Sequence, residues 1–212
     1  MDTSVTVRQR RKEARPGELT AAALQLFVEK GFAATRLDDV AAHAGVSKGT
    51  LYLYFDSKEA LFKAVIEESL LPVMDAGDEL VDQFVGSAVD LLRALITAWW
   101  DLIGNTPLGG VPKLMVSESR NFPELAAYYH DTVIVRGRDL MRRVLKRGLD
   151  TGEFRCVDIE LAIDVIFAPV LMLMIWRHSL GSCGCGSHNA EDYLNTHLDL
   201  ALHGLVSARN HS

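Results

Sequence analysis

Apolar residues recur every three to four positions along almost the whole chain, and no stretch alternates long enough for a β-strand. The first helix is expected over about residues 18–30, with Leu19, Ala23 and Phe27 on one face and Gly31 as its C-terminal stop. Longer helices are expected over roughly residues 77–103, 123–149, 158–178 and 190–208, with a short one between Pro107 and Ser119. The pattern predicts an all-α protein.

Three shorter helices are expected directly after the first. Thr35 is in position to cap one of them, with Asp38 reaching back three residues later. Gly45 and Val46 form a turn, after which Ser47 caps a helix that runs to about Phe55. Ser57 caps the next helix, which stops near Pro72. Two short helices joined by a tight turn and packed on a longer helix are typical of a helix-turn-helix.

The helix after Ser47 has an outer face that differs from an ordinary salt-bridged surface. At about 100° per residue, Leu51 and Phe55 face the core, and Gly49 and Leu53 lie opposite. Thr50 and Tyr52 flank that face, so it offers close approach, a hydroxyl, a phenol and an apolar contact for a thymine methyl. Ser47, Lys48 and the helix N-terminus are placed to meet phosphates. Lys58 begins the next helix, where its charge opposes the helix dipole, which favours an outside anion as its partner.

Residues Thr35 to Phe62, TRLDDVAAHAGVSKGTLYLYFDSKEALF, resemble the TetR/AcrR family of one-component bacterial transcription regulators. The resemblance implies an all-helical homodimer with a three-helix DNA-binding head and a divergent ligand-binding body. It implies that Tyr54 and Lys58 hold phosphates. Many members have a second hydroxyl where Arg36 stands, and we expect Arg36 to reach a phosphate here. The expected DNA-binding residues are Thr35, Arg36, Ser47, Lys48, Gly49, Thr50, Tyr52, Leu53, Tyr54 and Lys58.

Length and charge agree with a small head joined to a larger body. The chain has 212 residues, 49% of them hydrophobic, which excludes wholesale disorder. Its net charge is −6, but residues 1–62 hold nine Lys or Arg against eight Asp or Glu, whereas the rest holds thirteen against twenty. We expect a basic disordered arm over residues 1–14, a DNA-binding domain over 15–62 and an effector-binding and dimerisation domain over 63–212. Three cysteines and no apolar leader favour a cytoplasmic protein with no membrane partner.

The resemblance also implies that the helices near 158–178 and 190–208 pair with their copies in a dimer. The run from Val165 to Trp176 is apolar all round, so it suits either a dimer interface or an internal core helix. On the dimer interpretation, Leu173 and Leu202 are expected at the interface. Pro169 is expected to kink the first of these helices.

The family's cavity lies among the helices here placed at 77–149 and 158–178. Aromatic and methionine side chains there suit a small hydrophobic effector. The candidate pocket residues are Trp99, Trp100, Met115, Phe122, Tyr128, Tyr129, Phe167, Met172 and Trp176. Ordinary core packing is the alternative for each of them.

The chain also contains a Cys/His cluster and a basic run, and it lacks catalytic motifs. His178, Cys183, Cys185 and His188 surround a glycine-rich loop and offer soft ligands, so a metal- or thiol-responsive regulator is the alternative function. A run of arginines over 136–147 suits a charged solvent face better than a second nucleic-acid site. No nucleophile–base set, phosphate loop or HExxH motif is present, so the sequence predicts a non-enzyme without a cofactor. The leading prediction is a repressor that a small hydrophobic effector releases from a palindromic operator.

Overall fold

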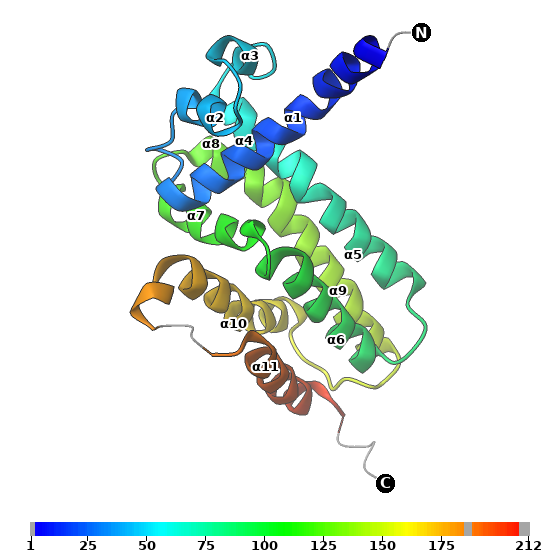
Figure 1. The fold of residues 1–212 in the computed structure, drawn as a ribbon. Coiled ribbons are helices and arrows are strands. Elements are labelled where there is room, and N and C mark those ends of the chain that lie inside the picture. Colours follow the sequence, from blue (N-terminus) through cyan, green and yellow to red (C-terminus); the bar gives the residue numbers. More distant parts are fainter. Residues whose placement is uncertain (1–2, 185–187, 208–212) are drawn as a thin grey trace.

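The fold is that of a computed structural model, which describes residues 3–184 and 188–207, with the backbone alone for residues 3–15 and Ser182. Its described residues form helices throughout, and the one β-type pairing among them is an isolated antiparallel bridge between Phe154 and Val206. Figure 1 shows a small head, formed by the first four helices, at one end of a larger helical body. The prediction of an all-α protein is confirmed.

The head consists of α1 (Thr3–Lys30), α2 (Leu37–His43), α3 (Lys48–Tyr52) and α4 (Lys58–Ser69). Helix α1 ends as predicted at Gly31, whose φ of +90° suits a residue without a Cβ. It begins earlier than predicted, at Thr3. Residues 3–14, which were expected to form a disordered arm, belong to this helix. Helix α3 is shorter than predicted and ends at Tyr52 rather than near Phe55. Leu51 and Phe55 are buried as expected.

The first long helix of the body is divided in two. The prediction of one helix over 77–103 is wrong: α5 (Leu71–Gln83) ends before a short loop, and α6 (Ala88–Trp99) begins after it. The hydroxyl of Ser87 accepts a hydrogen bond from the amide of Asp90, and Gly86 has a φ of +150°. A serine cap and a glycine conformation therefore interrupt an otherwise continuous apolar period.

The remaining body helices follow the predicted ranges closely. A π-helical turn (Trp100–Gly104) extends α6, and a 3₁₀ turn (Pro107–Gly110) leads into α7 (Val111–Glu118). Helix α8 (Pro123–Tyr129) passes through a second π-helical turn (His130–Ile134) into α9 (Val135–Asp150). Helix α10 (Ile159–Ser179) contains Pro169 without an interruption, and a short 3₁₀ turn (Gly181–Cys183) precedes α11 (Ala190–Leu205).

Helix α9 lies at the centre of the body and packs against α5, α6 and α10 (Figure 1). Its arginines form ion pairs on two sides. Arg136 and Arg143 pair with Asp78 of α5 at 2.6 Å each, and Arg142 pairs with Glu160 of α10 at 2.7 Å. The arginine run therefore binds α9 to its neighbouring helices. It is neither a free charged surface nor a second basic patch.

Helix α10 is long and apolar enough by composition to cross a membrane. Its packing gives another reason for this composition. One side is buried against α7, α9 and α11, and a second side carries the exposed apolar residues Leu161, Val165 and Met172. A helix with a buried apolar side and an exposed apolar side has apolar residues around its whole circumference, so its sequence shows no polar face.

Candidate nucleic-acid interface and effector cavity

Helix α3 is held in place by its own N-terminal cap. The hydroxyl of Ser47 accepts a hydrogen bond from the amide of Thr50 at 3.1 Å and lies 2.8 Å from the Thr50 hydroxyl. The predicted cap at Ser47 is confirmed, as is the equivalent cap of α4 by Ser57, which accepts from the amide of Ala60. The caps fix the N-terminus of α3 at the surface, where its free amides face solvent.

The outer face of α3 is open and carries an unusual apolar residue. The side chain of Leu53 is 82% exposed, Tyr52 is 44% exposed, and no side-chain or backbone atom blocks Gly49 closely. Lys48 lies above the Tyr52 ring, with Nζ 5.7 Å from its centroid. Tyr54 is half-buried against the core. A large exposed aliphatic side chain beside a phenol contributes nothing to the fold of the head, so this face is suited to an external partner.

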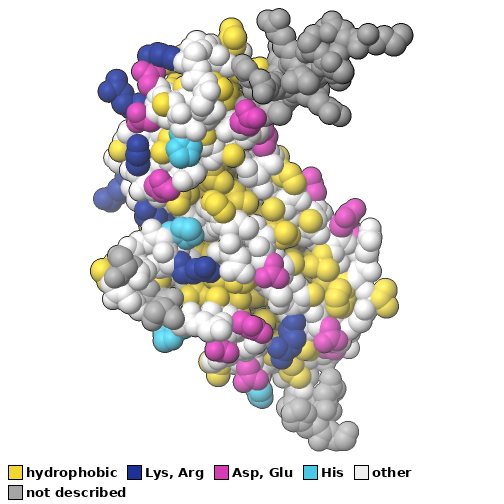
Figure 2. Space-filling view, in the orientation of Figure 1, with side chains coloured by type: hydrophobic (Ala, Val, Ile, Leu, Met, Phe, Trp, Pro, Cys, Tyr) yellow, Lys and Arg dark blue, Asp and Glu magenta, His cyan; other side chains and the backbone are white. Residues whose placement is uncertain are grey.

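Cations lie close to this face. Lys48 forms an ion pair with Asp38 at 2.9 Å, and this partner raises the pKa of the lysine. Arg36, the residue before α2, is exposed, and it is close enough to Lys48 for its positive charge to lower the pKa of that lysine slightly against the effect of Asp38. Figure 2 shows Lys and Arg side chains gathered along the edge of the molecule that includes this part of the head. Asp and Glu side chains lie among them, so the edge presents cations in a mixed-charge surface on a chain of net charge −6.

The structure corrects the interpretation of Thr35. The residue before α2 is Arg36, and α2 has no side-chain cap, so Thr35 does not cap this helix. The Thr35 side chain is 1% exposed, and its one hydroxyl proton is shared between the carbonyl oxygens of Gly31 at 2.7 Å and Leu26 at 3.2 Å. The threonine fastens the end of α1 to the following loop, and its hydroxyl is turned away from the surface that includes α3.

Lys58 also has a different environment from the one that its sequence position suggests. Its ammonium donates to three backbone carbonyls, those of Phe32 at 2.6 Å, Thr35 at 3.0 Å and Ala33 at 3.1 Å. These three bonds use all three of its N–H donors. Burial lowers the pKa of Lys58, and its Nζ lies 4.5 Å from the centroid of the Phe32 ring. Lys58 therefore has an internal partner that explains its place at the start of α4, without an outside anion.

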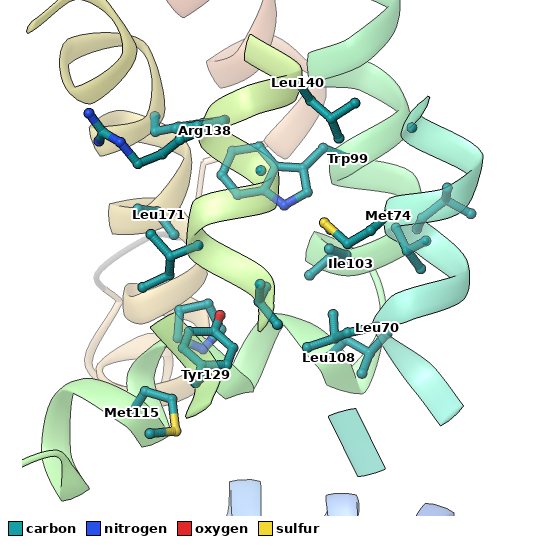
Figure 3. A pocket seen from close by; sticks show the side chains of 18 of the residues that line it. Leu70, Met74, Trp99, Ile103, Leu108, Met115, Tyr129, Arg138, Leu140 and Leu171 are labelled. Carbon is teal, nitrogen blue, oxygen red and sulfur yellow. The ribbon is translucent and has the colours of Figure 1, made fainter. Parts of the chain in front are cut away.

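The body contains a cavity of about 550 Å³. Its wall is formed by α5, α6, α7, the α8–α9 segment and α10, together with the 3₁₀ turn through Leu108. Figure 3 shows mainly aliphatic and aromatic side chains around it, including Met74, Ile103 and Leu171. A mostly apolar cavity of this size is typical of a site for a small organic ligand.

Four of the nine predicted pocket residues line the cavity: Trp99, Met115, Tyr129 and Phe167. The other five lie elsewhere. Trp100 is buried beside Gly104, because adjacent residues of a helix point about 100° apart. Phe122 packs edge-on against Phe32 of the head, and Tyr128 donates to Glu67 of α4. Met172 is exposed, and Trp176 is half-buried outside the cavity wall. Most of the pocket residues that the sequence missed are aliphatic, such as Leu70, Leu108 and Leu140, and nothing in their spacing separates them from ordinary core.

The loop considered for metal binding is partly outside the described residues, which exclude Cys185. His178 is half-buried, and burial lowers its pKa. Cys183 and His188 are exposed. Across the described ranges, no three His, Cys, Asp or Glu side chains come together as a candidate metal site.

A capped recognition-type helix with an open face, on a body with an apolar cavity, defines a helix-turn-helix regulator with a ligand site. A family model of bacterial regulatory proteins, tetR family, matches residues 19–65, and a model of the tetracyclin repressor-like C-terminal domain matches residues 81–180. The chain belongs to the tetR family, and it is a ligand-responsive DNA-binding transcriptional regulator.

Similarity to individual proteins extends along most of the chain. It is 31% identical over 173 residues to the HTH-type transcriptional regulator YdeS of Bacillus subtilis, covering 78% of this chain and 80% of that protein. It is 27% identical over 201 residues to the HTH-type transcriptional repressor KstR2 of Rhodococcus jostii, covering 94% of this chain and 95% of that protein. The crystal structure of FadR from Bacillus subtilis in complex with stearoyl-CoA has the same fold, with a TM-score of 0.72 and 21% identity over 88% of this chain and 97% of FadR.

Proposed function

We propose that the protein is a repressor that binds a two-fold symmetric operator as a homodimer and is released by a small apolar effector. The observation that carries the proposal is the exposed pair of Tyr52, the last residue of α3, and Leu53, its C-cap. An 82% exposed leucine on a capped helix has no role within the head, whereas the major groove offers thymine methyl groups for such a side chain. The protein would act in the cytoplasm, where its operator is found.

We assign the head residues by their position around α3. Residues 15–62 form the DNA-binding unit, and residues 63–212 bind the effector and the second subunit. Gly49, Thr50, Tyr52 and Leu53 face the bases, and Ser47, Lys48, Tyr54 and the N-terminus of α3 meet phosphates. Arg36 contacts a phosphate through a charge-assisted hydrogen bond. Thr35 and Lys58 hold the loop that positions α2 and are not themselves in contact with DNA.

The second subunit is expected to cover the exposed apolar side of α10 and α11. Leu161, Val165 and Met172 are 64%, 70% and 42% exposed, and with Ala168 they follow the four- and three-residue spacing of a helix-packing seam. Leu200 of α11, 69% exposed, adds to this surface. Leu173 and Leu202, the positions that the sequence suggests, are buried within the subunit. They therefore belong to its core.

The effector site is assigned to the cavity of about 550 Å³. Its apolar wall supports a hydrophobic ligand, and so does the structure of FadR, a protein of the same fold that is in complex with stearoyl-CoA. The alternative of a metal-responsive regulator is not supported by any cluster of metal-ligating side chains among the described residues.

The proposal is tested by fluorescence anisotropy with duplex DNA from the region upstream of the protein's own gene. Wild-type protein should bind a two-fold sequence with half-sites one helical turn, roughly 34–36 Å, or a multiple apart. The Leu53→Ala variant should lose affinity, whereas Val85→Ala, which truncates an exposed valine of the body outside the cavity wall, should not. Equal affinity of all three proteins for the operator would contradict the assignment of α3.

A further inference from the structure

The cavity wall has few charged groups, and those present are already paired. Among the described lining residues, Arg138 and Asp164 are the two with charged side chains. They form an ion pair with each other, and Arg138 also pairs with Glu160 at 2.9 Å. In Figure 3 the guanidinium of Arg138 points away from the labelled apolar side chains. No cation of the described wall is therefore free to neutralise a ligand anion.

Neutral hydrogen-bond donors are present instead. Tyr129 of α8 lines the cavity, and its hydroxyl has no hydrogen-bond partner among the described residues. In Figure 3 this hydroxyl points toward the middle of the lining side chains. The neighbouring Tyr128 differs, because its hydroxyl donates to Glu67 at 2.9 Å. Tyr129 is half-buried, and no described side-chain oxygen is both fully buried and unpartnered, so its hydroxyl stays accessible from the cavity and can donate to a ligand atom there.

The chemistry of the donor limits the ligand group that it can bind. Burial raises the pKa of Tyr129 to about 12, so the phenol keeps its proton at neutral pH and donates a hydrogen bond. An uncharged carbonyl oxygen accepts such a bond and loses little on entering an apolar site. A carboxylate would lose its hydration without gaining a counterion, which is far more costly.

We propose that the effector is an apolar molecule with an uncharged carbonyl oxygen, as in a ketone, ester or thioester, that accepts a hydrogen bond from the hydroxyl of Tyr129. This inference rests on the proposed assignment of the cavity as the effector site. It narrows the effector from hydrophobic molecules in general to those whose buried part is neutral and carries one acceptor.

The test uses three probes of nearly the same shape: 2-acetylnaphthalene, 2-ethylnaphthalene and 2-naphthoate. Isothermal titration calorimetry measures their affinity for wild-type protein, Tyr129→Phe and the matched control Tyr128→Phe. In wild type, the ketone should bind at least about tenfold more tightly than the carboxylate. Tyr129→Phe should weaken ketone binding by about two- to twelvefold, the range expected for one neutral hydrogen bond, and leave 2-ethylnaphthalene unchanged. Tyr128→Phe should bind all three as wild type does.

Several results would overturn the inference. These are carboxylate binding as tight as ketone binding, equal loss of the ketone and the ethyl compound in Tyr129→Phe, and no ketone binding up to its solubility limit. The comparison of ketone and carboxylate uses wild type alone, so it stands even if Tyr129→Phe melts at a lower temperature. The calorimetry is done without DNA, so these results would not affect the operator-binding test. Failure to bind any operator would instead contradict the proposed function itself.

Discussion

The carboxylate of Glu118, in the last turn of α7, accepts a hydrogen bond of 3.1 Å from the backbone amide of Ala33, in the loop between α1 and α2. Glu118 is 9% exposed and is the buried acid among the described residues. Met115 and Ser119, one turn or less away on the same chain segment, line the cavity. Glu118 therefore joins the wall of the cavity to the loop that leads into the helix-turn-helix, in addition to the covalent connection through α4.

We expect Glu118→Ala to uncouple effector binding from DNA release. The change leaves the Ala33 amide without its partner, which should lower stability by about 1–3 kcal/mol. Effector affinity, measured without DNA, should stay as in wild type. A typical coupling weakens operator binding about 5- to 150-fold at saturating effector, and this factor should fall toward one. Anisotropy titrations of operator with and without effector measure it.

Two variants make this prediction specific. Glu118→Gln keeps an acceptor oxygen for the Ala33 amide and should retain most of the coupling. Glu124→Ala removes an exposed acid of α8 and should behave as wild type. A Glu118→Ala protein with the full effector response would show that α4 carries the motion without α7.

We expect Lys58 and Arg36 to affect different measurements. Lys58→Ala removes three hydrogen bonds from a charged donor to the α1–α2 loop, so unfolding by urea should show a loss of about 1.5–3 kcal/mol. The slope of operator affinity against salt should not change. Arg36→Ala should leave stability intact and lower that slope by about one unit, because one phosphate contact is lost.

The control for this pair is Lys146→Ala, which removes an exposed cation of α9 in the body. It should change neither stability nor the salt slope. A reduced salt slope in folded Lys58→Ala protein would restore this lysine as a phosphate contact.

The serine caps and Lys58 show how much of the head structure can be predicted from the sequence alone. The caps at Ser47 and Ser57 are predictable, because each hydroxyl binds an amide three residues along the chain. The partners of Lys58 lie 23 to 26 residues away, and their position depends on how α1 packs against α4. A lysine that donates hydrogen bonds to the carbonyls of a distant loop therefore has the same sequence pattern as a lysine that contacts phosphate.

The cavity was less predictable than the head. Trp99 and Trp100 are adjacent and chemically identical, but the first lines the cavity and the second packs beside Gly104. Their difference follows from the rotation of α6, which the sequence does not define well where an apolar helix continues into a π-helical turn. Residue type indicates an apolar ligand, whereas the wall itself depends on tertiary packing.

We expect Val165→Asp to prevent dimerisation without unfolding the subunit. Val165 is 70% exposed on α10, so a carboxylate there is solvated in the monomer but would be buried between two subunits. Size-exclusion chromatography with light scattering should give a monomer with wild-type helix content. Operator affinity should fall, because one subunit reaches one half-site.

Two matched substitutions separate dimerisation from folding. Val85→Asp places the same charge at an exposed valine in the loop before α6 and should leave the dimer intact. Leu173→Asp buries a charge in the core of the subunit and should give insoluble or unfolded protein. A Val165→Asp protein that remains a dimer would place the interface elsewhere.

We expect mild acid to loosen α11 from α10 through His197. The ring nitrogen Nε2 of His197 lies 2.9 Å from the carbonyl oxygen of Ile166, and burial lowers the pKa of the ring below 6.5. Between the lowered value and 6.5, the unfolded chain binds more protons at this site than the folded chain. The stabilising contribution is therefore complete above about pH 6.5 and is lost as the pH falls through the lowered pKa.

The measurement is urea unfolding at several pH values from 8 to 5, for wild type and His197→Gln. Carboxylates and other histidines contribute equally to both proteins, so the difference between the two curves isolates His197. Wild type should lose more stability than the variant as the pH falls. His203→Gln, at an exposed position of the same helix, should follow the wild-type curve. Parallel curves for wild type and His197→Gln would show that the ring titrates alike in the folded and unfolded chains, and that its contact with Ile166 does not depend on the neutral form.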